Sequence, residues 1–378
     1  MKVIKGATVL TMAERDYAPG DVLLDQGKIV QVDSKVAVPD DCEVIDATGM
    51  FILPGFIDVH CHIGAIEDGV DDANEMTCPR TPQVRVMDSV NPQDPEFAAA
   101  RAAGFTMLLI HPGSGNVIGG QSVLVKTAGA VVDDMVVRQP AGLKFAFGGN
   151  PKHRFPGKAD NHPKTRMGVA AVFRQAFMEA RDYIERRAQG NDEPVNLGLE
   201  IVAKVLRKEI PARVHVARSD DILTVIRLCK EFDIDFTLEH VTAGHCVVKE
   251  ILDSGAPCVI GPMFSPKGAS ETKELTFRTP GVLASEGVKV ALTVDHPVIP
   301  LSHSLYQTAV CVKAGMAPND ALKAMTINGA EIAGVGDRTG SIEPGKDADL
   351  VVMTGYPFDI DTDVYMTLVN GKVVYKKC

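Results

Sequence analysis

Short runs of alternating apolar and polar residues mark both ends of the chain. The N-terminal runs are VIKGATVLTM, DVLLDQGKIVQV and CEVIDATGMFILP, which Gly, Asp and Pro interrupt as they do between β-strands. The C-terminal run ADLVVMTG…YMTLVNGKVVYKK has the same texture, and its Asn370-Gly371 pair is a hairpin turn signal. The pattern predicts one small β-sandwich domain built from both termini, residues 1–53 and 346–378.

Between the two ends, apolar strand patterns alternate with helical periodicity. The strand candidates are FTMLLIHPG, GLKFAFGGN, ARVHVA, DFTLEHVT, PCVIGP and VKVALTVDHP. The helical segments are RMGVAAVFRQAFMEARDYIERRAQ, DILTVIRLCKEF, VVKEILDSG and DALKAMTINGAEIAG. Such alternation is typical of a parallel sheet in an α/β fold. The length favours a (β/α)₈ TIM barrel over residues 54–345.

Glycine-rich stretches do not indicate a nucleotide site. No GxGxxG follows the first strand, which disfavours a dinucleotide fold. GSGNVIGG, residues 113–120, lacks the Lys-Ser/Thr end of a P-loop. We interpret it as a flexible loop at the active site.

Two histidines stand one residue apart where the first barrel strand ends. PGFIDVHCHIG rises through apolar residues and then presents His60 and His62. Residues two apart in a strand share a face, so both imidazoles can reach one ion, whereas Cys61 points away. Barrel enzymes keep their active sites at this end of the strands. A pair of structural histidines is the alternative interpretation.

Three later strands also end in residues that bind metals. His215 ends IPARVHVA, His240 ends DFTLEH, and Asp295 ends VKVALTVD. Imidazole and carboxylate ligands suit Zn²⁺, Fe²⁺, Mn²⁺ or Co²⁺. Together with the first pair, these residues predict a centre for one or two divalent ions, with Zn²⁺ favoured.

The order and spacing of these motifs resemble the amidohydrolase superfamily of metal-dependent hydrolases. The resemblance rests on PGFIDVHCH, His215, His240, TVDHP and the tail TINGAEIAGVGDRTGSIEPGKDADLVVM, and it covers nearly the whole chain. The nearest likeness is to imidazolonepropionase-like and prolidase-like members. The resemblance implies a barrel with a terminal β-domain, and it leaves the substrate open.

The resemblance also implies a further ligand on the fourth barrel strand. Many relatives carry a carboxylated lysine there that bridges two metals, and Lys144 in GLKFAFGG occupies this place. A buried charged lysine is costly, and a carbamate would replace its positive charge with two ligand oxygens. The alternative is a lysine that snorkels or forms an ion pair. Some relatives have Glu where this chain has Gly149, so that ligand is absent.

By resemblance, the activity is hydrolysis of an amide-type C–N bond in a cyclic amide, an imide, or an N-acyl or dipeptide-like small molecule. A metal-bound hydroxide attacks the carbonyl carbon, and Asp295 carries the proton to the leaving nitrogen. A deaminase of a heterocyclic amine is the first alternative, although Arg218 stands where such relatives usually place a glutamate. A catalytically dead barrel that only binds a ligand is the second.

Four further polar residues are candidates for binding the substrate. His111 ends LLIHPG, and His153, Arg154 and Arg166 lie in GGNPKHRF…HPKTRMG. A guanidinium beside the site would bind a carboxylate through two hydrogen bonds. Packing for His111 and a solvated loop for the others are the alternatives.

Composition narrows the class of protein. The chain has 378 residues, 45% of them hydrophobic, and a net charge of −10. The charge disfavours nucleic acids and anionic membranes as partners. The sequence shows neither a signal peptide nor a run of about 18 apolar residues that could span a membrane. We therefore expect a cytoplasmic enzyme with a small-molecule substrate, and the sequence leaves open whether it forms a homo-oligomer.

Overall fold

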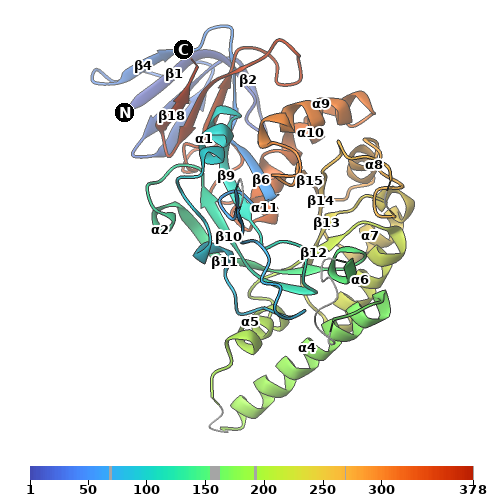
Figure 1. Cartoon of the computed structure of the whole chain (residues 1–378). Helices are drawn as coiled ribbons and strands as arrows, with labels where there is room; N and C mark the ends of the chain where they lie inside the picture. Colours follow the sequence, from blue (N-terminus) through green and yellow to red (C-terminus); the bar gives the residue numbers. More distant parts are fainter. Residues whose placement is uncertain (68–69, 154–161, 191–193, 269, 378) are drawn as a thin grey trace.

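The computed structural model describes residues 1–67, 70–153, 162–190, 194–268 and 270–377 (Figure 1). Strands from both ends of the chain form one eight-stranded sheet of order β18-β17-β16-β5-β1-β2-β3, with β4 paired to β1. Figure 1 shows the blue and dark red strands, and both termini, together at the top. These strands are β1 (Lys2–Val9), β2 (Tyr17–Asp25), β3 (Lys28–Asp33), β4 (Glu43–Asp46), β5 (Phe51–Pro54), β16 (Leu350–Met353), β17 (Val364–Val369) and β18 (Lys372–Lys376).

The predicted β-sandwich is confirmed in part. The C-terminal strand β16 pairs with β5 of the N-terminal segment, so both ends do build a common sheet. Strand β1 pairs in parallel with both β4 and β5, so the pairing joins all eight strands into one sheet rather than two separate ones. The domain boundaries at residues 53 and 346 remain a prediction.

A second eight-stranded sheet forms a nearly closed barrel of order β15-β14-β13-β12-β11-β10-β9-β6. Its two edges meet through side-chain and loop hydrogen bonds: Thr293 Oγ1 donates to the His60 carbonyl at 2.6 Å, and His62 N donates to the His296 carbonyl at 3.0 Å. The strands are β6 (Phe56–Cys61), β9 (Phe105–Ile110), β10 (Ile118–Lys126), β11 (Val136–Ala146), β12 (Ala212–Val216), β13 (Phe236–His240), β14 (Cys258–Ile260) and β15 (Val290–Leu292).

Strand β10 departs from the predicted (β/α)₈ alternation. It runs antiparallel to both β9 and β11, whereas the other adjacent pairs in this sheet are parallel. The expectation of a flexible loop over residues 113–120 was therefore wrong for its second half, since Ile118–Gly120 begin this buried strand. Glycines at 119 and 120 suggest a loop, but close packing explains them: a Cβ at Gly120 would lie 2.6 Å from Val84 Cγ2.

Helices cover the outside of the barrel, and the longest, α4, extends along its lower side in Figure 1. Helix α4 begins where the Thr165 hydroxyl accepts a hydrogen bond from Gly168 N. Its inner face packs Phe173 and Phe177 against the barrel strands. The helices are α1 (Pro95–Ala102), α2 (Val132–Met135), α3 (Asn150–His153), α4 (Arg166–Ala188), α5 (Leu197–Leu206), α6 (Ser219–Phe232), α7 (Val248–Ser254), α8 (Thr279–Ser285), α9 (Ser304–Lys313), α10 (Pro318–Ala324) and α11 (Ile327–Ile332).

Short elements join the main strands and helices in the described part of the chain. A two-stranded hairpin, β7 (Ile66–Glu67) with β8 (Val70–Asp71), follows the first barrel strand. The short 3₁₀ helices are η1 (Val86–Asp88), η2 (Gly244–Cys246) and η3 (Leu301–His303). Among the described residues, none of the helices combines the length and the apolar composition that crossing a bilayer requires.

A buried ionic cluster joins the barrel to the terminal sheet. The Lys126 ammonium at the end of β10 lies 2.6 Å from Asp347 Oδ2 and 2.9 Å from Asp349 Oδ2, and it also donates to Asn370 Oδ1. Asp347 also forms ion pairs with Lys28 at 2.7 Å and with Arg338 at 2.8 Å. Since both carboxylates are buried, the cluster fixes the terminal sheet against β10.

Candidate metal centre

His60 on β6 and His62, which directly follows this strand, project into the barrel. Both side chains are buried. Their Nε2 atoms lie 3.5 and 3.3 Å from Oδ1 of Asp295, which arrives from the far edge of the sheet. The structure thus brings the predicted pair and the predicted carboxylate together.

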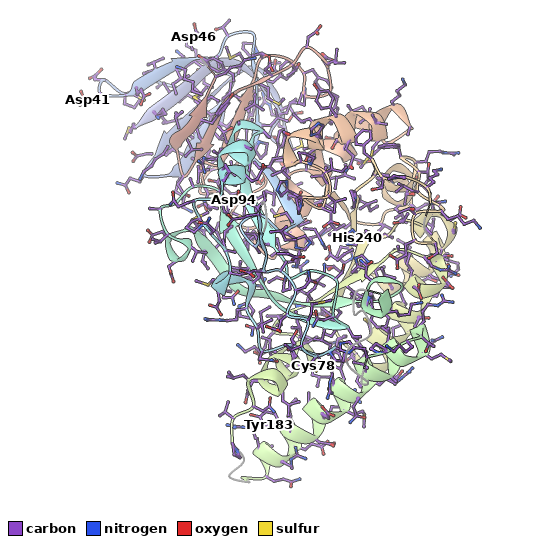
Figure 2. All side chains as sticks on the ribbon, viewed as in Figure 1. Asp41, Asp46, Cys78, Asp94, Tyr183 and His240 are labelled. Atoms are coloured by element: carbon purple, nitrogen blue, oxygen red, sulfur yellow. The ribbon has the colours of Figure 1, made fainter. Side chains whose placement is uncertain are left out.

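His240 and Asp295 reach the centre from turns at the strand ends. Both residues have left-handed backbones, with φ of 72° and 55°, a conformation that non-glycine residues rarely adopt and that concentrates at functional sites. Each of His60, His240 and Asp295 offers one ligand atom, and these atoms lie within 4.8 Å of one another. Figure 2 labels His240.

His215 and Lys144 complete the set of predicted metal ligands. The His215 ring lies 4.3 Å from the His240 ring, measured between centroids. Lys144 Nζ on β11 lies 3.1 Å from His60 Nε2 and is buried. All six residues predicted as metal ligands therefore meet at the same end of the barrel, although they come from five strands or strand ends.

Hydrogen bonds fix which ring nitrogens face the centre. His62 Nδ1 lies 2.8 Å from the carbonyl oxygen of His111, and His240 Nδ1 lies 2.7 Å from that of Gly261. A carbonyl oxygen can only accept, so each Nδ1 carries the proton, and in the neutral ring each Nε2 keeps its lone pair. His62 Nε2 then faces Asp295 Oδ1 at 3.3 Å, and both atoms could bind the same divalent cation.

Burial perturbs the ionisation of this cluster. It lowers the pKa of Lys144 to about 8, although the Glu239 and Asp295 carboxylates act in the opposite direction. It holds the pKa of His60 well below its ordinary value, so the ring is neutral and can act as a ligand. Burial would raise the pKa of Asp295, but His240 and His62 outweigh it and lower the pKa. The carboxylate is therefore ionised at neutral pH.

Glu239 is a buried carboxylate that we did not predict. Its Oε2 lies 2.9 Å from His60 Nδ1, and its Oε1 accepts a hydrogen bond from the Thr237 hydroxyl, bonded at 2.5 Å. Burial raises the pKa of Glu239, and the buried Arg213 and Lys144 oppose that shift. A carboxylate that holds the outer nitrogen of a ligating histidine fixes the ring and its tautomer.

The sequence does contain a signal for buried charges beside the metal ligands: two charged residues lie two positions before a predicted ligand. Asp58 precedes His60 and Arg213 precedes His215 by two, so each pair shares a strand face. Asp58 Oδ1 accepts from His60 N at 2.9 Å, and burial raises the pKa of Asp58 to about 7. A charged residue inside an otherwise apolar strand, on the same face as a predicted ligand, therefore indicates a side chain that points into the barrel.

His111 lies behind the centre rather than at its opening. Its Nε2 donates to the Val59 carbonyl at 3.0 Å, and its Nδ1 lies 2.6 Å from the Ser122 hydroxyl. His111 also forms a second candidate group of metal ligands with His60 and Glu239, but both of its ring nitrogens already make hydrogen bonds within the protein. We therefore assign the ion to the group that contains Asp295, and a substrate role for His111 stays an untested prediction.

The other predicted substrate residues are not gathered at the centre within the described part of the chain. Arg166 is half exposed at the start of α4 and pairs with Asp220 and Asp221, so its guanidinium is engaged at the surface. His153 ends α3, but its side chain is not described, and Arg154 lies outside the described residues. Their roles in binding stay predictions.

Comparison with known proteins identifies the family. The Amidohydrolase family matches residues 51–374, which is most of the chain. The chain belongs to this family. The predicted resemblance is confirmed, and a metal-dependent hydrolase is the class of enzyme that the family supports.

Known amidohydrolases resemble the chain over its whole length. A solved amidohydrolase from Thermotoga maritima MSB8 is 41% identical, covers 100% of both chains and has a TM-score of 0.96. The curated amidohydrolase tasK of Hapsidospora irregularis is 29% identical over 93% of this chain, which spans only 39% of that relative's length.

Two more distant matches carry different activities. A 5-methylthioadenosine/S-adenosylhomocysteine deaminase from Symbiobacterium thermophilum is 24% identical over 99% of this chain and 93% of its own. A prolidase complexed with N-methylphosphonate-L-proline shares the fold, with 18% identity, full coverage of both chains and a TM-score of 0.61. These matches leave the substrate open.

Proposed function

We propose that the protein is a metal-dependent hydrolase of amide-type C–N bonds in small molecules, namely cyclic amides, imides, or N-acyl or dipeptide-like compounds. The observation that carries the proposal is the arrangement of imidazole Nε2 atoms around the Asp295 carboxylate. His60 and His62 bring theirs within 3.5 and 3.3 Å of Asp295 Oδ1. Family membership supports hydrolysis as the reaction class.

The residues of the centre have separable roles. His60, His62, His215 and His240, with Asp295, would hold the ion, for which we propose Zn²⁺. A divalent ion bound there would acidify water and polarise a carbonyl oxygen. Asp295 would take the proton from the attacking water and deliver it to the leaving nitrogen, because its lowered pKa keeps the carboxylate ionised beside the histidines. Glu239 keeps the His60 ring in place.

We propose that Lys144 is carboxylated in the active protein. Its neutral amine attacks CO₂, forming a new N–C bond and releasing one proton, which leaves a carbamate anion. The pKa of about 8 supports this step, because the neutral amine is much more abundant near pH 8 than for an ordinary lysine. The carbamate oxygens would lie near His60 Nε2, which is 3.1 Å from Nζ, and could bridge to a second ion.

Deamination of a heterocyclic amine is the rival activity, and the deaminase relative keeps it open. Arg218, however, stands where such relatives usually place a glutamate. It precedes α6, and its guanidinium pairs with Asp220 at 2.9 Å on the half-exposed surface. Since no carboxylate occupies that position, amide hydrolysis is the better proposal.

A substrate panel tests the proposal. Protein loaded with Zn²⁺ would be assayed with lactams, hydantoins, imides, N-acyl amino acids and dipeptides, and in parallel with aminated heterocycles. Ring opening or amine release that disappears in Asp295→Asn supports amide hydrolysis. Stoichiometric ammonia from an aminated heterocycle assigns the deaminase activity, and a metal-free parent protein would indicate a barrel that only binds a ligand.

A further inference from the structure

Asn150 lies at the opening of the candidate centre, directly after the pair Gly148-Gly149 that follows β11. It is half-buried at the first position of α3. Its amide nitrogen Nδ2 lies 3.3 Å from Nε2 of His215 and donates to Ser114 Oγ at 2.7 Å. An uncharged donor thus points directly at a predicted ligand nitrogen.

The loop that carries Ser114 is held in place by the protein. Gly113 N donates to the Ala73 carbonyl at 2.8 Å, and Gly115 N donates to Asn74 Oδ1 at 2.8 Å. A Cβ at Gly113 would lie 2.3 Å from Asn74 Nδ2, so a larger residue here would displace the Asn74 side chain that holds the loop. The Ser114 hydroxyl is therefore a fixed acceptor that directs the amide of Asn150 toward His215.

If His215 binds an ion, the two N–H groups of the Asn150 amide no longer have equivalent partners. One N–H keeps its hydrogen bond to Ser114 Oγ. The other loses its acceptor, because the ion takes the lone pair of His215 Nε2. Within the described residues, Oδ1 of Asn150 accepts no hydrogen bond, so the amide can turn without breaking another contact. The released N–H then faces whatever molecule lies next to the ion.

We propose that Asn150 is a substrate-positioning residue whose released N–H donates to a carbonyl oxygen of the substrate beside the scissile bond. The inference rests on the proposed function and deepens it. An amide donor aimed by a hydroxyl carries no charge, so it suits an uncharged carbonyl, as in a lactam, imide or N-acyl group. A guanidinium would instead select a carboxylate.

The test uses the Co²⁺-loaded protein and acetohydroxamic acid, a small uncharged carbonyl compound that loses one proton when it chelates a divalent ion as acetohydroxamate. Binding is followed through the visible absorption of Co²⁺. Asn150→Ala should keep the parental Co²⁺ stoichiometry and weaken acetohydroxamate binding at least about tenfold, as expected for one lost hydrogen bond in a closed site. Ser114→Ala should weaken it less, because the donor remains and only its direction is lost.

Asn328→Ala is the matched control. Its amide donates to the Val290 carbonyl at 2.8 Å, at the start of β15 and therefore at the opposite end of the barrel. This variant should bind acetohydroxamate like the parent, even if thermal unfolding shows a loss of stability. Parental acetohydroxamate affinity in Asn150→Ala, or loss of Co²⁺ from it, overturns the inference.

The same experiment separates this inference from the proposed function. If the parent protein hydrolyses no amide of the panel, the proposed function fails, while the acetohydroxamate titration still measures the donor role of Asn150. If the parent is active and Asn150→Ala retains parental affinity for acetohydroxamate, only the role of Asn150 fails.

Discussion

The His60 imidazole and the Glu239 carboxylate meet at 2.9 Å inside the barrel, although they come from β6 and β13. Glu239 accepts the Nδ1 proton of His60, so Nε2 of the same ring turns toward Lys144 and Asp295. The contact links the first strand of the barrel to the strand that carries His240. It explains how one ring can be both buried and correctly oriented as a ligand.

Glu239→Gln should weaken metal binding without preventing folding. The amide can still accept the His60 proton, but it lacks the charge that strengthens the ring as a ligand. We expect metal affinity to fall by about 10- to 100-fold, measured by competition with a chelator. Glu231→Gln, which removes a surface partner of Arg174, is the control and should change nothing. Parental affinity in Glu239→Gln would show that the contact is only structural.

Replacing both His60 and His62 with Ala should remove the metal and leave the fold. Two ligands at the end of β6 are lost, whereas the apolar residues of β6 that pack the core remain. Elemental analysis should find less than stoichiometric metal, and circular dichroism should match the parent. His303→Ala, at an exposed position, is the control. Stoichiometric metal in the double variant would refute the ligand assignment.

Asp295→Asn should abolish most of the turnover while preserving the shape of the site. Positioned acid–base catalysis contributes about 10²- to 10⁴-fold, so we expect kcat to fall at least about a hundredfold, or about 2.7 kcal/mol of barrier. The metal content should fall less than in the double histidine variant, since the histidines supply most ligands. Turnover at the parental rate on an identified substrate would exclude Asp295 as the proton carrier.

The cluster around Asp347 should make stability sensitive to acid. Burial would raise the pKa of Asp347, but Lys126 and Lys28 lower it to about 2. Because the folded-state pKa lies below that of the unfolded chain, this contribution is complete above about pH 4 and is lost as the pH falls through about 2. Asp347→Asn should destabilise the protein by about 3 kcal/mol at neutral pH.

Urea unfolding of the parent and of Asp347→Asn between pH 6 and pH 2 checks this prediction. The difference between their unfolding free energies should shrink below about pH 4. Asp253→Asn, which removes only an exposed pair with Lys249, is the control. A difference that stays constant down to pH 2 would mean that the charge of Asp347 does not stabilise the fold.

The ligand positions could be predicted because parallel strands end at a common edge. His60, His62, His215 and His240 each follow an apolar run, and strand ends of a barrel converge whatever the loops do. Strand β10 could not be predicted in the same way. Its glycines suggest a loop, and only the folded structure shows the close approach of Gly113 to Gly119 and of Val84 to Gly120.

The inner layer of the centre escaped prediction for a different reason. Glu239 lies in a short apolar strand, where its partner His60 is distant in sequence and only the folded barrel brings them together. Arg166 shows the reverse case. Its position in the sequence suggested a role in substrate binding, but in the folded chain its guanidinium forms ion pairs with Asp220 and Asp221. In both cases, the position of the side chain depends on a charged partner that is distant in sequence, and the local sequence pattern does not reveal it.

Anomalous scattering at the zinc absorption edge, from crystals of the protein grown with Zn²⁺, would locate the ion among these ligands. We predict a peak about 2.0–2.2 Å from ligand atoms of His60, His62 and Asp295, with His240 and His215 completing the site. A second peak beside Lys144, with density for a carbamate on Nζ, would add the bridging ligand. Zinc bound elsewhere, or no peak among these residues at saturating Zn²⁺, would contradict the account.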